Sequence, residues 1–237
     1  MSTSVNPRRA TFEHRLFFAS VLLIFAVVVA GFARTYYLKG FFGTPALPWL
    51  VHLHGALMTA WFVLFFAQIA LIASDRVAWH RRLGVIGAGL ALAILVLAPI
   101  VLVRATSREL GSPQGHQGFV VIFGMDLVVL ADFAILVATA IALVLRGLGA
   151  AHKRLMLLAA CSITLPGISR LPIAVSGIFG IFYALILVPV VVDTARHRRL
   201  HPAFAWGAPL LIATQRLAYA GATTHAWHDF VMRLFTH

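Results

Sequence analysis

Seven long apolar runs, separated by short polar segments, constrain this chain more than any other feature of its sequence. The runs cover residues 15–34, 47–73, 82–104, 117–146, 154–171, 174–194 and 203–223. About 20 apolar residues are enough for a helix to cross the hydrocarbon core of a bilayer. The sequence therefore predicts an all-α fold: a polytopic bundle of seven transmembrane helices forming one domain over 15–223, with short tails at 1–14 and 224–237.

The fifth and sixth runs are the least regular part of this pattern. Pro166, Gly167 and Pro172 interrupt them. The distance between the basic clusters at 152–154 and 196–199 nevertheless leaves room for two passes, rather than one or three. Seven spans are therefore favoured over six.

The composition agrees with a membrane protein. Hydrophobic residues make up 61% of the chain and charged residues only 11%, which is more apolar material than a soluble core of this size can bury. The formal net charge is +12, but the basic residues stand in clusters between apolar runs, where they set topology and do not indicate nucleic-acid binding. The single cysteine, Cys161, excludes a disulfide framework and a cysteine-based metal site.

Lys and Arg are distributed unequally between the two ends of the predicted spans. One end carries twelve of them and the other six, while Arg216 falls inside the seventh run. Because these residues concentrate in cytoplasmic loops, the richer end predicts an inside N-terminus and an outside C-terminus, in a bacterial inner membrane. The seventh run has no lysine for a retinal Schiff base, which argues against a retinal protein. The richer end holds Arg8, Arg9, Arg15, Arg76, Arg81, Arg82, Arg146, Lys153, Arg154, Arg196, Arg198 and Arg199.

Eleven histidines are a large number for a membrane protein of this size. Neutral imidazole ligates metal ions and haem iron, and it can do so between helices. His52, His54 and His116 lie at the outer ends of the second and fourth runs, whereas His80 and His152 open the third and fifth runs from the inside. This alternation predicts one group of histidines at each face of the membrane.

A short basic motif, His-[Arg/Lys]-Arg-Leu, occurs three times and opens three odd-numbered runs from the inside. Two interpretations stay open. The motif can form an interfacial collar whose side chains reach lipid phosphates, or some of its histidines can be ligands whose basic neighbours neutralise an anionic group. The three copies cover residues 80–83, 152–155 and 197–200.

The most distinctive sequence lies between residues 47 and 170. It contains an HxH pair at 52–54, Trp61, Gln68, HRRLG at 80–84 and HKRLM at 152–156. These motifs resemble the cytochrome b561-like di-haem membrane cytochromes, and also a group of bacterial polytopic membrane proteins with the same HxH, Q, HRRLG and HKRLM pattern. The runs outside this region have no counterpart in the resemblance.

The resemblance implies one or two b-type haems held by crossed histidine pairs. His54 and His116 would ligate an outer haem, and His80 and His152 an inner one. His54 is preferred to His52, because positions two apart on a helix face about 200° apart. The implied function is transmembrane electron transfer by a membrane oxidoreductase, with a quinol, a small carrier or a redox partner protein.

Several polar side chains fall within the apolar runs, where they are costly and usually face a partner or a cavity. Asp126 and Asp132 lie in the fourth run, and either could pair with Arg216 in the seventh. Gln68 continues a stripe of sevenfold spacing that includes His54. Arg170 could offer its guanidinium to a haem propionate.

Other functions fit the same sequence. His52, His54 and His116 could hold copper or zinc near the outer face. The chain could also be a non-redox transporter or an assembly factor for a respiratory complex, with or without a bound metal. A third alternative is a structural subunit whose histidines are only interfacial. Hydrolytic chemistry has no support, because the sequence has no glycine-rich phosphate loop, nucleophile elbow or HExxH motif.

Overall fold

The computed structural model describes residues 7–112 and 118–235, and every regular element in this part of the chain is a helix. Five helices are long and apolar enough to cross a membrane: α1 with its continuation to Tyr37, α2, α3, α4 and α7. The protein is therefore a multi-pass membrane protein. The elements are α1 (Pro7–Phe32), η1 (Ala33–Tyr37), η2 (Lys39–Phe41), α2 (Trp49–Ala73), α3 (Val77–Leu110), α4 (Gly118–Leu145), α5 (Gly149–Ser162), α6 (Leu165–Ile168), α7 (Val175–His197), α8 (Pro202–Ala222) and α9 (His225–Phe235).

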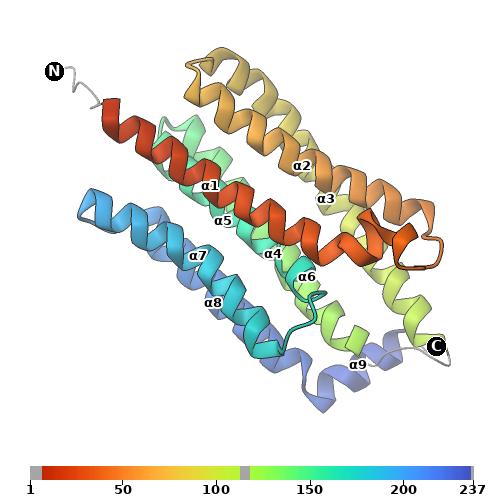
Figure 1. Cartoon of the computed structure of the whole chain (residues 1–237). Helices are drawn as coiled ribbons and strands as arrows, with labels where there is room; N and C mark the ends of the chain where they lie inside the picture. The colour runs from red at the N-terminus through yellow and green to blue at the C-terminus, as the bar shows by residue number, and fades with distance from the viewer. Residues whose placement is uncertain (1–6, 113–117, 236–237) are drawn as a thin grey trace.

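The long helices run side by side in one elongated bundle, and the chain reverses direction at alternate ends of it (Figure 1). The start of α1 and the α2–α3, α4–α5 and α7–α8 connections lie at one end. The α1–α2 and α6–α7 connections and α9 lie at the other. We call these the N-terminal end and the C-terminal end of the bundle.

The interrupted fifth run forms two helices, α5 and α6, that continue roughly in line (Figure 1). The break has a local cause, because Pro166 has no backbone N–H with which to extend the α5 ladder. Two hydroxyl groups satisfy carbonyls at the break: Ser162 donates to the Ala159 carbonyl at 2.8 Å and Thr164 to the Cys161 carbonyl at 2.6 Å. Nearly all of α5 beyond Lys153 is buried, so this helix lies inside the bundle.

Close packing of α1 on α6 depends on two glycines. A Cβ atom added to Gly31 would collide with the backbone carbonyl of Gly167. The two backbones therefore approach more closely than any side chain would permit, as small residues allow in membrane bundles. On the other side of α5, α4 packs along both α5 and α8, and large buried side chains such as Phe133 and Phe204 fill the space between them.

The segments that the sequence assigns to tails contain helices: the start of α1 and all of α9. α1 begins at Pro7, well before the apolar run. After α8, α9 places apolar side chains at helical spacing against the C-terminal end of the bundle. Val231 is fully buried against Leu102 and Val120, and the Trp227 indole N–H donates to the Val120 carbonyl at 2.9 Å.

Candidate functional site

Two histidines meet at the N-terminal end of the bundle. His80 is in the first turn of α3 and His152 in the first turn of α5, and their ring centroids are 6.4 Å apart with an interplanar angle of 82°. α3 packs mainly on α2 and α4, while α5 packs mainly on α4 and α8. The histidine pair thus joins two helices that are not close-packed partners.

A carbonyl group fixes the orientation of His152. Its Nδ1 lies 3.0 Å from the carbonyl oxygen of Ala140. A carbonyl can only accept, so Nδ1 carries the proton and, in the neutral ring, Nε2 keeps its lone pair. Ligating histidines are usually held this way, with one nitrogen bonded to a carbonyl or carboxylate and the other free for the metal.

Buried polar atoms without partners lie beside this pair. Nδ1 of His80 and Oε1 of Gln68 are buried and make no hydrogen bond within the described part of the chain. Gln68 comes from α2 and faces α3 at Gly84, one turn beyond His80. An unpaired buried polar atom costs about 1–3 kcal/mol, so these two atoms call for a partner such as a water molecule, an ion or a cofactor.

The predicted stripe on α2 runs along the interior of the bundle. Trp61 is buried and its ring meets Phe133 of α4 at 5.1 Å between centroids. Nε1 of Trp61 and Nδ1 of His54 are also buried without a partner among the described residues. His54, Trp61 and Gln68 therefore direct unsatisfied polar atoms to the same side of α2, at sevenfold spacing.

His54 marks a second site toward the C-terminal end. The charge of Arg170, just after α6, acts on both His54 and Asp126 of α4. Arg170 is held in place by Phe32, whose ring centroid lies 4.5 Å from its guanidinium carbon, and by a hydrogen bond to the Pro166 carbonyl. His116, the predicted partner of His54, falls outside the described residues.

The two histidines of the HxH pair face different surroundings, as their spacing predicts. His52 is exposed and its ring packs 5.7 Å from the Tyr36 ring. The Tyr36 hydroxyl donates to the backbone carbonyl of His52 at 3.2 Å. Among the described residues, no three histidine, cysteine, aspartate or glutamate side chains are grouped closely enough to hold one metal ion.

Known protein families, curated proteins and solved structures offer no parallel to this site. No protein-family model matches this chain, and neither does any curated protein or solved structure. The resemblance to di-haem cytochromes therefore stays a prediction from the motifs.

The sequence prediction for Arg216 is wrong in two respects. Arg216 is exposed, not buried, and its guanidinium carbon lies 5.2 Å from the Phe179 ring centroid. The buried Asp132 accepts hydrogen bonds from Thr214 and Gln215 instead, both at 2.8 Å. Successive helix residues point about 100° apart, so a helix that turns Gln215 toward α4 turns Arg216 away from it.

Sequence reasoning missed Asp193 and left the role of Arg154 open. One of the two interpretations of its motif places Arg154 in an interfacial basic collar, yet only 3% of its side chain is exposed, and 1% of that of Asp193. Arg154 donates from Nη2 to Asp193 Oδ1 at 2.7 Å and from Nε to Oδ2 at 3.0 Å. One feature of the sequence could have indicated Asp193. It is an acidic residue at the end of an apolar run, in a chain with only seven acidic residues.

Proposed function

We propose that this protein carries electrons across a membrane as a b-type haem protein, with His80 and His152 as the residues that would hold the inner haem. The geometry of this pair is the observation on which the proposal rests. Two imidazoles that share one metal ion at about 2 Å from each nitrogen have ring centroids about 6 Å apart. The separation of 6.4 Å agrees with that requirement.

The surrounding residues fit such a group. The Ala140 carbonyl holds His152 so that its Nε2 is available. His80 and Gln68 contribute buried polar atoms that have no hydrogen-bond partner among the described residues. When bound, haem b supplies a one-electron carrier whose potential the ligands and the surrounding burial set.

We further propose a second, outer haem at His54, with His116 as its other ligand. Arg170 supplies a cation beside His54, which suits the carboxylates of a propionate-bearing group. Asp126 is influenced by the same cation and is a candidate to accept a proton when a quinol or small reduced carrier is oxidised. His52 is exposed and has no part in this proposal.

The proposal includes seven crossings, an inside N-terminus and a bacterial inner membrane. Two crossings, α5–α6 and α8, add to the five long apolar helices. α5 need not be strongly apolar, because its side chains face other helices and not lipid. α8 has 21 residues, a length of about 30 Å at 1.5 Å per residue. The N-terminal end of the bundle then faces the cytoplasm, since it carries most of the basic residues.

A reduced-minus-oxidised spectrum of the purified protein tests this function. Protein from haem-replete cells is expected to be red, with a haem-to-protein ratio of one or two. His80→Ala and His152→Ala should each lose the same haem, and His54→Ala should lose a different one if the outer haem is present. His52→Ala, an exposed histidine two residues away, is the matched control and should keep the wild-type ratio.

A colourless, monodisperse wild-type protein from such cells would overturn the proposal. That result would favour the non-redox alternative, a transporter or an assembly factor. Metal analysis of the same sample would then show whether copper or zinc is bound. An unchanged haem content in both His80→Ala and His152→Ala would also contradict the assignment of the inner ligands.

A further inference from the structure

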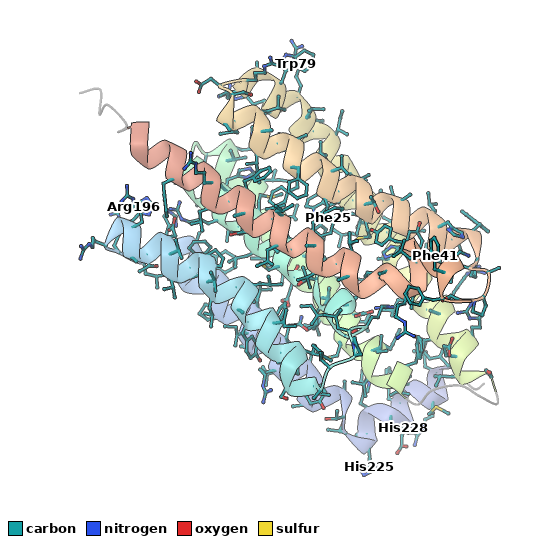
Figure 2. The ribbon with its side chains drawn as sticks, in the orientation of Figure 1. Phe25, Phe41, Trp79, Arg196, His225 and His228 are labelled. Carbon is teal, nitrogen blue, oxygen red and sulfur yellow. The ribbon has the colours of Figure 1, made fainter. Side chains whose placement is uncertain are left out.

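A buried acidic side chain lies between α4 and α8 in the interior of the bundle. Asp132 stands near the middle of the 28-residue α4, between the two ends of the bundle that Arg196 and His225 mark in Figure 2. Only 1% of the residue is exposed, and the residues one turn away on α4, Val129 and Leu136, are buried and apolar. Because α4 is long and apolar enough to cross the membrane, Asp132 lies within the crossing segment.

The hydrogen-bond partners of this carboxyl group are neutral. They are two side chains of α8, Thr214 and Gln215, each 2.8 Å from Oδ2 of Asp132. Within residues 7–112 and 118–235, no Lys, Arg or His forms an ion pair with Asp132. An ionised carboxylate without a counter-charge is so costly in an apolar interior that such a group usually takes up a proton instead. The charge balance therefore indicates a neutral acid.

The hydroxyl group of Thr214 provides an independent indication, because it has more acceptors than it can serve. Its Oγ1 lies 2.8 Å from Asp132 Oδ2 and also 2.8 Å from the backbone carbonyl oxygen of Leu210. A hydroxyl carries one hydrogen, and a carbonyl oxygen and an ionised carboxylate can only accept. If Asp132 were ionised, one of these two short contacts would contain no hydrogen. A proton on Asp132 supplies the second one.

The side-chain amide of Gln215 shows the same shortage of donors. Its Nε2 donates to Asp132 Oδ2, while its Oε1 is buried and accepts no hydrogen bond from the described part of the chain. Oε1 belongs to the amide group that already bonds the carboxyl group, so it lies beside that group. A carboxylic acid can donate to this oxygen, whereas an ionised carboxylate cannot.

We propose that Asp132 binds a proton and is a neutral carboxylic acid in the folded protein, so that α4 and α8 enclose a proton-binding site within the membrane. The acidic hydrogen has two acceptors, Oε1 of Gln215 and Oγ1 of Thr214. The bound proton supplies the hydrogen that these contacts lack and removes the unpaired charge. It is therefore part of the contact between α4 and α8. This inference does not depend on haem.

Infrared difference spectroscopy of the full-length protein in detergent at pH 7 tests the proposal directly. A protonated carboxyl group has a C=O stretching band that lies above the amide bands and shifts in D₂O, and an ionised carboxylate lacks this band. The spectrum of wild type minus that of Asp132→Asn should contain one such band. The matched control is Asp193→Asn, which removes a carboxylate that is paired with Arg154, and its difference spectrum should contain none. Identical spectra of wild type and Asp132→Asn in this region would overturn the proposal.

Two further variants keep Asp132 and change only its partners. Thr214→Val and Gln215→Leu each remove one hydrogen-bonding group from the carboxyl group. At least one of them should move the band to higher wavenumber, because the C=O bond of a carboxylic acid stiffens when a hydrogen bond is lost. This measurement remains decisive if Asp132→Asn does not fold. The absence of any protonated carboxyl band that responds to these variants would contradict the proposal.

Thermal unfolding distinguishes a proton from a metal cation at the same oxygens. Asn resembles a protonated Asp, with one carbonyl oxygen and one donor, so Asp132→Asn should unfold at a midpoint no lower than wild type. Asp193→Asn should unfold at a lower midpoint, because Nε and Nη2 of Arg154 lose the carboxylate that they bind. Replacement of choline chloride by sodium chloride at constant ionic strength should shift wild type and Asp132→Asn equally. A sodium-dependent rise in the midpoint of wild type that Asp132→Asn abolishes would show a bound cation instead of a proton.

Discussion

At the scale of single residues, the most consequential interaction is the buried ion pair of Arg154 and Asp193. A buried pair contributes little relative to well-packed apolar side chains, but the loss of one partner leaves an uncompensated charge. Because the pair joins α5 to α7, its loss would also weaken the contact between these two helices.

Asp193→Ala is expected to reduce the free energy of unfolding by about 3–5 kcal/mol, because the buried Arg154 guanidinium would lose the carboxylate that both its Nε and its Nη2 bind. Denaturant titration in detergent micelles measures this change. Asp229→Ala, which removes a carboxylate that is 67% exposed, should have almost no effect. The double variant Arg154→Met/Asp193→Leu should recover most of the loss. A single-variant effect below 1 kcal/mol would show that the pair is not buried in solution.

His201 gives the protein a predictable dependence on pH. Burial, followed by the charge of Arg154, lowers the pKa of His201 from its ordinary value of 6.5, and Arg199 and Lys153 act in the same direction while Asp193 opposes them. A lowered pKa means that the folded state favours the neutral ring. The stabilisation is therefore fully present above pH 6.5 and is lost as the pH falls through the lower, folded-state pKa.

Acidification should thus weaken the α8 cap, since protonated Nδ1 cannot accept the Ala203 N–H. The unfolding midpoint of wild type is expected to fall between pH 7 and pH 5 by more than that of His201→Asn. Asparagine is a good N-cap that does not titrate in this range. Parallel pH profiles for the two proteins would contradict this account.

At the scale of helices, the closest contact is the crossing of α1 and α6. Gly31→Ala is expected to cost about 1–3 kcal/mol, because the new methyl group would meet the backbone of Gly167, which cannot rotate away. Gly180→Ala in α7 is the control, since a Cβ there has no neighbour within 4 Å and alanine favours the helix. Unfolding of both variants under the same conditions measures the difference, and an equal stability would mean that α1 does not pack on α6.

The helices also show how far the sequence could predict the fold. Apolar length gave α2 almost to the residue, since the run at 47–73 corresponds to Trp49–Ala73. The apolar run underestimated the length of α3, which begins at Val77 and includes the basic motif. Hydropathy marks the part of a helix that lies in lipid and does not mark its ends. Apolar length could not predict where α5 ends and α6 begins, because that break depends on Pro166 and on local hydroxyl groups.

The site was predictable to a smaller extent, for a physical reason. The alternation of histidines indicated that His80 and His152 share one end of the bundle, and the structure places their rings together. The partners of buried charges depend on helix rotation, which a single sequence does not reveal. Asp193 is 39 residues from Arg154, and the rotation of α8 that brings Gln215 to Asp132 removes Arg216 from it.

At the scale of the whole molecule, the order of the connections makes the position of the C-terminus a test of topology. Chain direction alternates at the two ends of the bundle through α8, so an inside N-terminus requires an outside α9 (Figure 1). Alkaline phosphatase is active only outside the inner membrane. Green fluorescent protein is fluorescent when it stays inside the cell and is not fluorescent when the general secretion pathway exports it. Full-length fusions should therefore give phosphatase activity without fluorescence, and fusions that end after residue 200, before α8, should give the reverse. If α8 did not cross, both fusion points would report the same side, and the seven-crossing arrangement would be replaced by one with α8 on the membrane surface.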